Sequence, residues 1–512
     1  MLFMFITIAI LLGIVYKFLD DRRKLPLPPG PKPLPLIGNI YQIPSENPWR
    51  KYQEWNATYG PIISFKLGLQ TVICLGTHQV AHEILAKKSE VYSSRPPLVF
   101  MGECVFRGLN TALLPYTKQW RLHSRIQTKF LKPVWAERYA PLYDLESKQL
   151  LLDFLHGDHD IRDVFLRFSY SLTATLTYSK RIETVDGKML RVIVEASESI
   201  AQMSATPMVS LVQLFPILNR LPRPLAPWKA LGDEIYEKAT ALYRDCWTEG
   251  QKSQSWNWLR GAFDRSVTAD IDTEEFIHII GFIFDAGAEP MTGVMEIFVL
   301  AMLTFPDVMK KAQQEIDQRM NATNRSNQMP AGEDLVHLPY TMAILEETLR
   351  WRSIAPGGFA HKTTADDEFG GYRIPKGSMV IFNHWGMDLD PEVFHNPMEF
   401  RPERWLENPD LPLAVFGFAR RACPGRHVGK GAIKLAICRM LWLFDILPPN
   451  VNGEEIKPDP LDMVQGLLSP PTPFKAVFKL RGVERADILE QEWRTTEKDP
   501  DTLMNSIYEK GA

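Results

Sequence analysis

The strongest constraint on the fold is a long apolar segment that runs from about Thr273 to Leu303. Asp272 and Glu275 make an arrangement like a capping box at its start, and Pro306 follows its end. As a helix of 1.5 Å rise per residue it would be about 45 Å long, enough to cross a whole domain. A helix that is apolar on nearly every side is buried. We therefore expect a fold built around one central helix.

The rest of the chain alternates between short β-like and longer helical patterns. Between residues 46 and 93 the two mix, and Pro61 to Cys74 is rich in β-forming side chains, which predicts a small mixed sheet. Beyond residue 115 helical patterns dominate, interrupted by prolines at 216–227 and by a polar loop at 321–332. The predicted fold class is mainly α with a smaller β region.

The pattern becomes irregular and β-like after residue 355, and a last helical run is predicted from about Pro424 to Leu443. Apolar residues make up 45% of the 512 residues, which is enough for a large core. We divide this part of the chain into a catalytic domain at 46–482 and a charged C-terminal tail at 483–512.

The N-terminus has the pattern of a membrane anchor. Met1 to Tyr16 carry no charge, and the basic residues Arg22, Arg23 and Lys24 follow the apolar run. A secretory signal would have positive charge before the run and a small-residue cleavage site after it. We predict a single-pass transmembrane signal anchor at 1–20 with the rest of the chain in the cytosol.

Residues 21–45 are predicted to form a basic and proline-rich hinge. Residues 25–35 read Leu-Pro-Leu-Pro-Pro-Gly-Pro-Lys-Pro-Leu-Pro, which cannot form a helix because each proline removes a backbone donor. We expect an extended connector between the anchor and the catalytic domain.

Charge and cysteine usage exclude several classes of protein. A net charge of -3 argues against bulk attraction to nucleic acid. The five cysteines are scattered and form no Cys-x-x-Cys pair, which disfavours a disulfide framework or a zinc site and suits a reducing compartment. They are Cys74, Cys104, Cys246, Cys423 and Cys438.

One cysteine stands where a metal ligand could be held. The segment from Phe416 to Gly425 places Cys423 at the exit of a glycine-containing loop, before a helix that Pro424 can start. Free N–H groups and the positive helix end would lower the pKa of its thiol. Arg421 could reach a carboxylate beside a bound metal. Taken alone, such a cysteine is more often a buried structural thiol.

Three further motifs are weak one by one. Glu347 and Arg350 share a helix face, which alone indicates only a surface ion pair. Pro402 to Trp405 places an arginine near a turn. Ala286-Gly287-Ala288-Glu289, followed by Pro290, interrupts the central helix with residues that disfavour helix, which indicates either a functional site or a packing kink.

Together, in this order and at these separations, the four motifs resemble the cytochrome P450 superfamily, in particular microsomal members of filamentous-fungal specialised metabolism. The resemblance spans nearly the whole chain. It implies a cytochrome P450 fold and a haem-thiolate monooxygenase. The cofactor would be haem b, with electrons from NADPH supplied through NADPH-cytochrome P450 reductase and cytochrome b5 as a possible second donor.

The resemblance also assigns roles to residues. Cys423 would be the axial ligand of the haem iron. The other cofactor-binding residues would be Arg421, His361, Trp120, Arg125 and Phe416, of which the first three would hold the haem propionates. The catalytic stretch would be Ala286, Gly287 and Glu289. Glu347, Arg350 and Arg404 would form a buried charge cluster.

Three positions depart from the family pattern. Pro290 stands where a threonine normally follows the acid, and Thr292 is rotated from that position by about 200° around the helix. Ser124 replaces the usual arginine, for which Arg121 or Arg125 could substitute. Ala419 replaces a glycine, from which we expect no strongly positive φ at that position.

These departures leave two alternatives open. One is a haem-thiolate isomerase, dehydratase or rearrangement catalyst without conventional oxygen activation. The other is a haem-binding protein without turnover.

The resemblance implies partners and a location as well. A basic face that would attract an acidic reductase is expected from eight side chains, namely Arg125, Lys129, Lys132, Arg420, Arg426, Lys430, Lys434 and Arg439. The expected location is the endoplasmic reticulum membrane, and no nucleic acid partner is expected.

The substrate would be a lipophilic small molecule in an apolar pocket. By resemblance, that pocket would be lined by the 96–114 loop, the helix near 200–215, the central helix around Phe282 and Asp285, the Ile354 to Phe359 turn, and Gly466 to Leu468.

Overall fold

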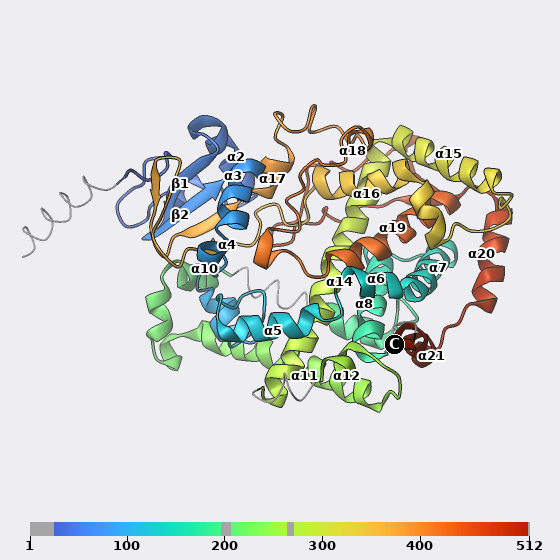
Figure 1. The fold of residues 1–512 in the computed structure, drawn as a ribbon, viewed down its shortest axis with the longest axis horizontal. Coiled ribbons are helices and arrows are strands. Elements are labelled where there is room, and N and C mark those ends of the chain that lie inside the picture. Colours follow the sequence, from blue (N-terminus) through green and yellow to red (C-terminus); the bar gives the residue numbers. More distant parts are fainter. Residues whose placement is uncertain (1–24, 196–205, 264–270, 510–512) are drawn as a thin grey trace, which may run out of the picture.

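A computed structural model describes residues 25–195, 206–263 and 271–509. The predicted anchor at 1–20 and residues 200–205 of the predicted pocket helix lie outside the described residues. Figure 1 shows a sheet-containing end, in blue and orange, beside a larger helical part through which α14 (Thr273–Thr304) runs. The Asp272 side chain accepts a hydrogen bond from the Glu275 N–H and caps α14 as expected. The predicted mainly α fold with a smaller β region is confirmed.

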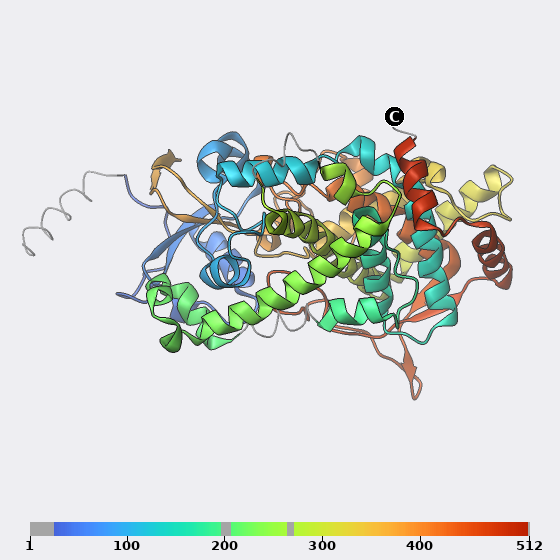
Figure 2. The ribbon, with the colours of Figure 1, turned by 90° about the horizontal axis from the view of Figure 1, so that it is seen from below.

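Of the helices before α14, the first three lie at the sheet-containing end (Figure 1), and most of the others belong to the helical part, where α11 (Pro227–Lys252) lies along the outside (Figure 2). Their bounds are α2 Pro48–Tyr59, α3 His78–Ala81, α4 Ser89–Tyr92, α5 Lys118–Thr128, α6 Pro133–Arg138, α7 Ala140–His156, α8 Ile161–Tyr178, α10 Pro207–Leu214, α11 Pro227–Lys252 and α12 Trp258–Ala262.

Most of the helices after α14 complete the helical part, while the short helix α17 (His384–Asp388) lies against α2 (Figure 1). Their bounds are α15 Pro306–Ala322, α16 Pro339–Trp351, α17 His384–Asp388, α18 Glu403–Glu407, α19 Arg426–Leu443, α20 Val483–Thr495 and α21 Pro500–Glu509. Since α19 and α14 both contribute long buried faces to one hydrophobic core, the cysteine loop that precedes α19 is fixed close to the central helix.

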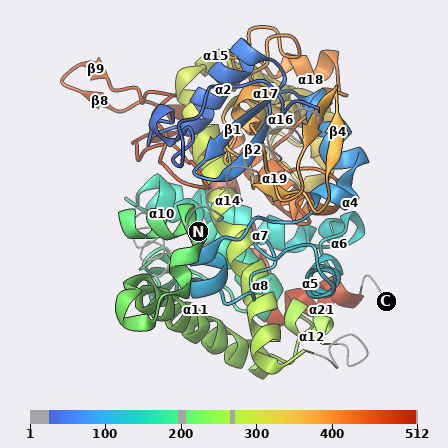
Figure 3. The same cartoon turned by 90° about the vertical axis from the view of Figure 1, so that its left-hand side faces the viewer.

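The main sheet is mixed, as the sequence predicts, but two of its strands come from the second half of the chain. Its strand order is β1-β2-β6-β3, with β2 and β6 parallel and the other pairs antiparallel. Figure 3 views the molecule from this side. The strands of the main sheet and of the smaller two-stranded sheets are β1 Ile62–Leu67, β2 Gln70–Leu75, β3 His361–Lys362, β4 Asp367–Phe369, β5 Tyr372–Ile374, β6 Met379–Phe382, β7 Phe444–Leu447, β8 Asn450–Val451, β9 Glu454–Glu455 and β10 Val477–Leu480.

The described part of the proline-rich segment lies against this sheet. The Ser64 N–H of β1 donates to the Pro29 carbonyl over 2.9 Å, and the Arg373 N–H donates to the Pro26 carbonyl over 2.9 Å. A Cβ on Gly30 would lie 1.9 Å from the Ser64 carbonyl oxygen, so the segment approaches β1 closely only because residue 30 is glycine. The segment is extended, as expected, and is also fastened to the catalytic body.

Within the described residues, α14 is the one helix long and apolar enough to cross a membrane. It lies mostly buried inside the protein, with 78% of its most apolar window covered. Its apolar surface is therefore that of a core helix.

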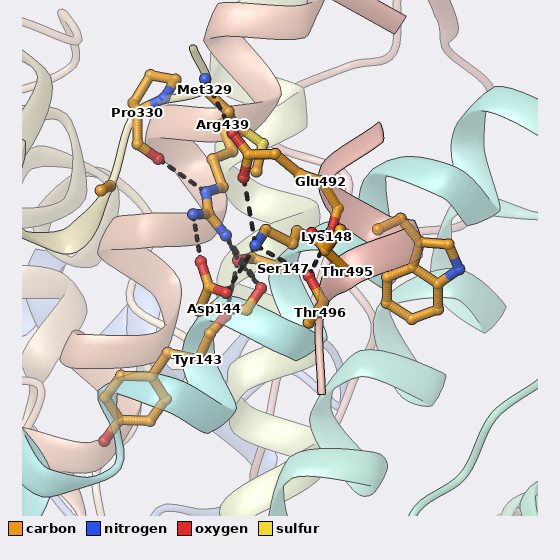
Figure 4. Close-up of polar contacts among 12 residues, drawn as sticks. Tyr143, Asp144, Ser147, Lys148, Met329, Pro330, Arg439, Glu492, Thr495 and Thr496 are labelled. Carbon is orange, nitrogen blue, oxygen red and sulfur yellow. Dashed lines mark hydrogen bonds and ion pairs between the residues drawn. The ribbon is translucent and has the colours of Figure 1, made fainter. Parts of the chain in front are cut away.

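The helix that contains Leu443, α19, ends at that residue as expected, but it is not the last helix. Helices α20 and α21 follow, and they bury Leu489, Leu503 and Met504 against the helical core. Figure 4 shows the polar part of this contact. Lys148 of α7 donates to Asp144 over 2.8 Å and lies 3.3 Å from the Glu492 carboxylate of α20. The charges that suggested a solvated tail make specific contacts that the sequence pattern does not reveal.

Candidate active site

The Cys423 loop is shaped by backbone contacts on both sides of the cysteine. The Cys423 N–H donates to the Phe416 carbonyl over 2.7 Å, and the Arg426 guanidinium donates to the Cys423 carbonyl over 3.1 Å. α19 begins at Arg426 with Gly425 as its N-cap, two residues later than the sequence suggests. The thiol thus lies at the N-terminal end of an 18-residue helix.

The thiol is surrounded by protein on all sides yet keeps accessible surface, so it lines interior space. Burial raises the pKa of the Cys423 thiol, against the opposing effects of hydrogen bonds from the Gly425 and Arg426 N–H groups and of the Arg426 charge. The N–H groups lower the pKa of the thiol as expected, but burial outweighs them. Coordination to a metal cation deprotonates a thiol outright, so a bound metal would stabilise the thiolate against this effect of burial.

The loop differs from expectation at Ala419. Its φ is +44°, in the left-handed region, so the position does require the conformation that glycine adopts easily. Gly417, two residues earlier, also has a positive φ of 68°. The tight loop that carries Cys423 is thus maintained at Ala419 with backbone strain.

A cluster of buried basic groups lies beside this loop. Arg421 donates to the carbonyls of Ser93 and Leu114, each over 2.7 Å, and its guanidinium lies 4.3 Å from the centre of the Trp120 ring. The Nδ1 of His361 lies 2.7 Å from the Tyr92 carbonyl. Arg421, Trp120 and His361 are therefore brought together as predicted.

Arg95 completes this cluster, and sequence reasoning missed it. It donates to the carbonyls of Phe359, Ala360 and Ala112 over 2.9, 2.7 and 3.0 Å. Burial lowers the pKa of Arg95 to about 10. The only sequence signal for it is its place in Ser93-Ser94-Arg95-Pro96, which by itself indicates a turn.

The basic cluster has no acidic partner among the described residues. Every hydrogen bond given above for the two arginines ends on a carbonyl, and burial together with Arg95 lowers the pKa of Arg421 to about 9. Burial, followed by Arg95 and Arg421, holds the pKa of His361 well below its usual range. Buried cations of this kind are costly unless an anion pairs with them. The cluster therefore fits a bound group that carries carboxylates.

Two other residues that were predicted to bind the cofactor, Arg125 and Phe416, are not part of the basic cluster. Arg125 is exposed on α5, about 140° around the helix from Trp120, and the structure does not bring it to the basic cluster. The Arg121 guanidinium lies 5.7 Å from the Tyr116 ring centre. Phe416 is half-buried, and its carbonyl accepts the Cys423 N–H.

The central helix passes this site without a break at Pro290. Because Pro290 has no N–H, the carbonyl of Ala286, four residues earlier, has no hydrogen bond from the helix. Ala286 is exposed to interior space, whereas a Cβ on Gly287 would lie 2.7 Å from Thr173 of α8. Ala286 thus faces open space, while Gly287 lets α8 and α14 approach closely.

Glu289 is held by an arginine that the sequence did not indicate. Arg162 of α8 donates to Glu289 over 2.8 Å and to Glu296, two helical turns further along, over 3.1 Å. Burial raises the pKa of Glu296 to about 7, against the lowering effect of Arg162. Glu289 keeps 24% of its side-chain surface exposed, so its side chain is in contact with solvent.

Thr292 cannot take over the role of a threonine at position 290. Its hydroxyl lies 3.3 Å from the Phe165 carbonyl and 3.2 Å from the Ser169 hydroxyl, and the residue is fully buried against α8. The rotation inferred from the sequence is confirmed.

In the cluster around Glu347, the protein itself supplies partners for the buried charges. Arg350 donates to both Glu347 oxygens, over 2.8 and 2.7 Å, and Arg404 donates to Glu347 over 3.0 Å. The Trp405 indole N–H adds a bond of 2.9 Å. Because Glu347 and Arg350 have 0% exposed side-chain surface, the surface-pair interpretation is excluded.

Most of the predicted basic face is accessible, with one exception. Arg420 is exposed, while Lys430 and Lys434 are partly exposed and lie 2.5 and 3.9 Å from the Glu346 carboxylate. Arg439 is buried and pairs with Asp144, so its assignment to that face is wrong (Figure 4). The error arises because only the tertiary structure shows which side of α19 faces α7.

Comparison with known proteins gives the same identification as the motifs. Residues 28–478 match the family model Cytochrome P450. The chain is 39% identical to the cytochrome P450 monooxygenase aneD of Aspergillus aculeatus, over 96% of this chain and 95% of the relative. It is 39% identical to the cytochrome P450 monooxygenase FrzL of Cladobotryum sp, over 97% and 95%, and 36% identical to the cytochrome P450 monooxygenase criE of Aspergillus cristatus, over 98% and 94%.

The chain therefore belongs to the cytochrome P450 family and is an oxidoreductase of the monooxygenase class. The family implies a haem-iron cofactor, and the residues present fit it. Cys423 would provide a thiol ligand, and Arg95, Arg421 and His361 would hold the two haem carboxylates.

Proposed function

We propose that this enzyme oxidises a lipophilic small molecule in fungal secondary metabolism, with dioxygen and with electrons that NADPH supplies through a reductase. The observation that carries the proposal is the combination of a buried thiol at the start of α19 with a basic cluster that lacks acidic partners. Haem b held there by Cys423 supplies the oxidising chemistry. The protein's own residues bind the haem carboxylates, position the substrate and move protons.

Proton supply is assigned to Glu289. Pro290 carries no hydroxyl, and Thr292 is turned into α8, so neither can donate a proton at this position. Glu289 has both a partly exposed carboxylate and a position next to the Ala286 carbonyl, which is free to accept a hydrogen bond from water. Arg162 acts as a positioning residue, because it holds the Glu289 carboxylate at the α8 side of α14.

The partner and the location follow from the accessible basic side chains and the N-terminal sequence. Arg420, Lys430 and Lys434 lie around the cysteine loop and offer a positive face to an acidic reductase. We assign cytochrome b5 as a second possible donor at the same face. The anchor proposed for residues 1–20 would place the enzyme in the endoplasmic reticulum membrane, with its catalytic domain in the cytosol.

The first experiment is the difference spectrum of the reduced protein with carbon monoxide. Wild-type protein should show a Soret band in the red-shifted position typical of thiolate ligation, and a Cys423→Ser variant that still folds should lack it. A band that survives in the variant would refute Cys423 as the ligand.

A second candidate function is favoured by Pro290, which removes the usual hydroxyl beside the acid. In that case the enzyme would isomerise, dehydrate or rearrange its substrate without external electrons. Oxygen uptake that requires NADPH and reductase supports the monooxygenase. Turnover of a peroxide substrate without either would support the alternative.

A further inference from the structure

A row of polar contacts, called the polar seam below, joins α11 to α14 on the N-terminal side of Ala286. Glu274 of α14 accepts a hydrogen bond from Tyr236, and His278 lies 3.0 Å from the Thr240 hydroxyl. Further along the same face, Asp285 accepts a hydrogen bond from the Tyr243 hydroxyl. Gly281 permits this last contact, since a Cβ there would lie 2.5 Å from the Tyr243 ring.

Asp285 differs from Glu274 in what surrounds its charge. Glu274 pairs with Arg244 as well as Tyr236, and it lies at the exposed end of the seam. Asp285 pairs with no arginine, lysine or histidine of the described chain. Burial raises its pKa to about 7, the Tyr243 hydroxyl opposes this, and the charge of Glu289 adds to it.

Asp285 also borders interior space. It is surrounded by protein on all sides, yet it keeps accessible surface, as Cys423 does. Its neighbour Ala286 is exposed, and Phe282, one turn earlier, is partly accessible, although α14 runs through the middle of the molecule (Figure 3). Phe282, Asp285 and Ala286 therefore form an accessible stretch of α14.

A second polar group near Asp285 lacks a partner. The hydroxyl of Tyr178 is buried and makes no hydrogen bond within the described residues, and the residue is 1% exposed. Burial, then Cys246 and then the charge of Asp285 raise the pKa of this phenol. A buried hydroxyl without a partner is costly. The region thus holds more hydrogen-bonding capacity than its own residues use.

We propose that Asp285, positioned by Tyr243, anchors the substrate through a basic nitrogen, so that the substrate class is a lipophilic amine. This deepens the proposed function and rests on it. An ammonium group supplies the cation that the buried carboxylate lacks and forms an ion pair with it. The apolar side chains of Phe282 and Ile283 accommodate hydrocarbon beside it. An amine that arrives protonated displaces the carboxyl proton to solvent, while a neutral amine takes that proton.

The test measures binding rather than turnover, with haem-loaded protein. The probes are dodecyltrimethylammonium, which has no lone pair to bind the iron, and 2,2-dimethyltetradecane, its uncharged counterpart of the same shape. Each is titrated while the Soret band is followed. Because the quaternary cation has no N–H, its preference reports the ion pair alone. Wild-type protein should bind the cation at least about tenfold more tightly, and Asp285→Asn should remove this preference while it leaves the affinity for the hydrocarbon unchanged.

Glu274→Gln is the matched control, because it removes a carboxylate of the same helix that is bonded to a tyrosine of α11. It should bind both probes as wild type does. Tyr243→Phe provides a second variant if Asp285→Asn does not fold. Loss of the phenol raises the pKa of Asp285, so the pH at which cation binding is half-maximal should move upward.

The proposal is overturned if wild-type protein binds the cation no better than the hydrocarbon, or if the preference survives in Asp285→Asn. An Asp285-dependent preference for dodecanol over the cation would overturn it in favour of a hydroxyl-bearing substrate. The carbon monoxide difference spectrum of each variant separates these results from failure of the proposed function, because it reports the haem-thiolate centre independently of substrate.

Discussion

Two buried charge clusters of this enzyme, around Glu347 and around Arg421, are built on opposite principles. Around Glu347, one carboxylate receives two arginines, an indole N–H and a backbone N–H, and the remaining guanidinium donors reach carbonyls. Around Arg421, two arginines and a histidine find only carbonyls. Burial lowers the pKa of all three groups, Arg95 adds to this at Arg421, and both arginines add to it at His361. The first cluster stabilises the fold by itself. The second cluster destabilises the cofactor-free protein, because its buried cations lack an anion. An anionic cofactor would supply that anion, so the same cluster would increase the affinity for the cofactor.

The largest effect is expected where the complete cluster is broken. Glu347→Ala leaves Arg350 and Arg404 buried without a counter-charge, which should lower the free energy of unfolding by about 3–5 kcal/mol. Chemical denaturation followed by circular dichroism measures this loss. Glu346→Ala is the control. Its partner Lys430 is partly exposed, so the loss should be only about 0–1 kcal/mol. Equal losses in the two variants would contradict the comparison.

The opposite result is expected in the incomplete cluster. Arg95→Met removes a buried cation that lacks an acidic partner, so haem-free protein should be as stable as wild type or more so. Its affinity for haem should fall by about 10- to 100-fold, since a hydrogen bond to a charged group contributes about 1.5–3 kcal/mol. Denaturation of haem-free protein and haem titration measure the two effects. A large loss of stability without haem would show that Arg95 is a structural residue.

Glu296 lies between the two extremes, because it shares Arg162 with Glu289. Its pKa is raised from 4.5 to about 7 on folding, so the folded protein keeps a proton that the unfolded chain has released. The stabilisation is complete below pH 4.5 and is lost as the pH rises through 7. Wild type should therefore lose about 1–3 kcal/mol relative to Glu296→Gln between pH 4.5 and 7.5. Parallel stability curves from urea denaturation across this range would argue against the shift.

The smallest effect is expected at Arg125, which was predicted to bind the cofactor. Its exposed place on α5 puts it outside the basic cluster, so Arg125→Gln should change haem affinity less than about twofold, well under 1 kcal/mol. Haem titration beside Arg95→Met measures the difference. A loss comparable with that of Arg95→Met would place Arg125 in the cofactor site and enlarge the incomplete cluster.

Local sequence signals predicted the elements that depend on neighbours in the chain. The central helix follows from its apolar pattern and its Asp272 cap, and its observed end is one residue from the expected one. The position of Cys423 before a helix follows from the loop and proline around it. Thr292 could be excluded as a hydroxyl donor from helix rotation alone, and its contact with Phe165 bears this out.

Tertiary structure alone decided which distant residues complete the sites. Arg95 and Arg162 had no distinguishing signal, because their roles depend on contacts with Phe359 and Glu289, which are remote in sequence. The φ of Ala419 was misjudged, since the loop around it imposes a conformation that alanine itself disfavours.

By itself, the sequence determined the class of enzyme and the central helix, and it predicted the metal ligand, because each depends on residue chemistry or on local periodicity. Which buried charges are neutralised by the protein, and which are left for a ligand, was decided only when the chain folded. That outcome depends on the contacts a side chain finds across the molecule, and these cannot be read from its neighbours in the chain.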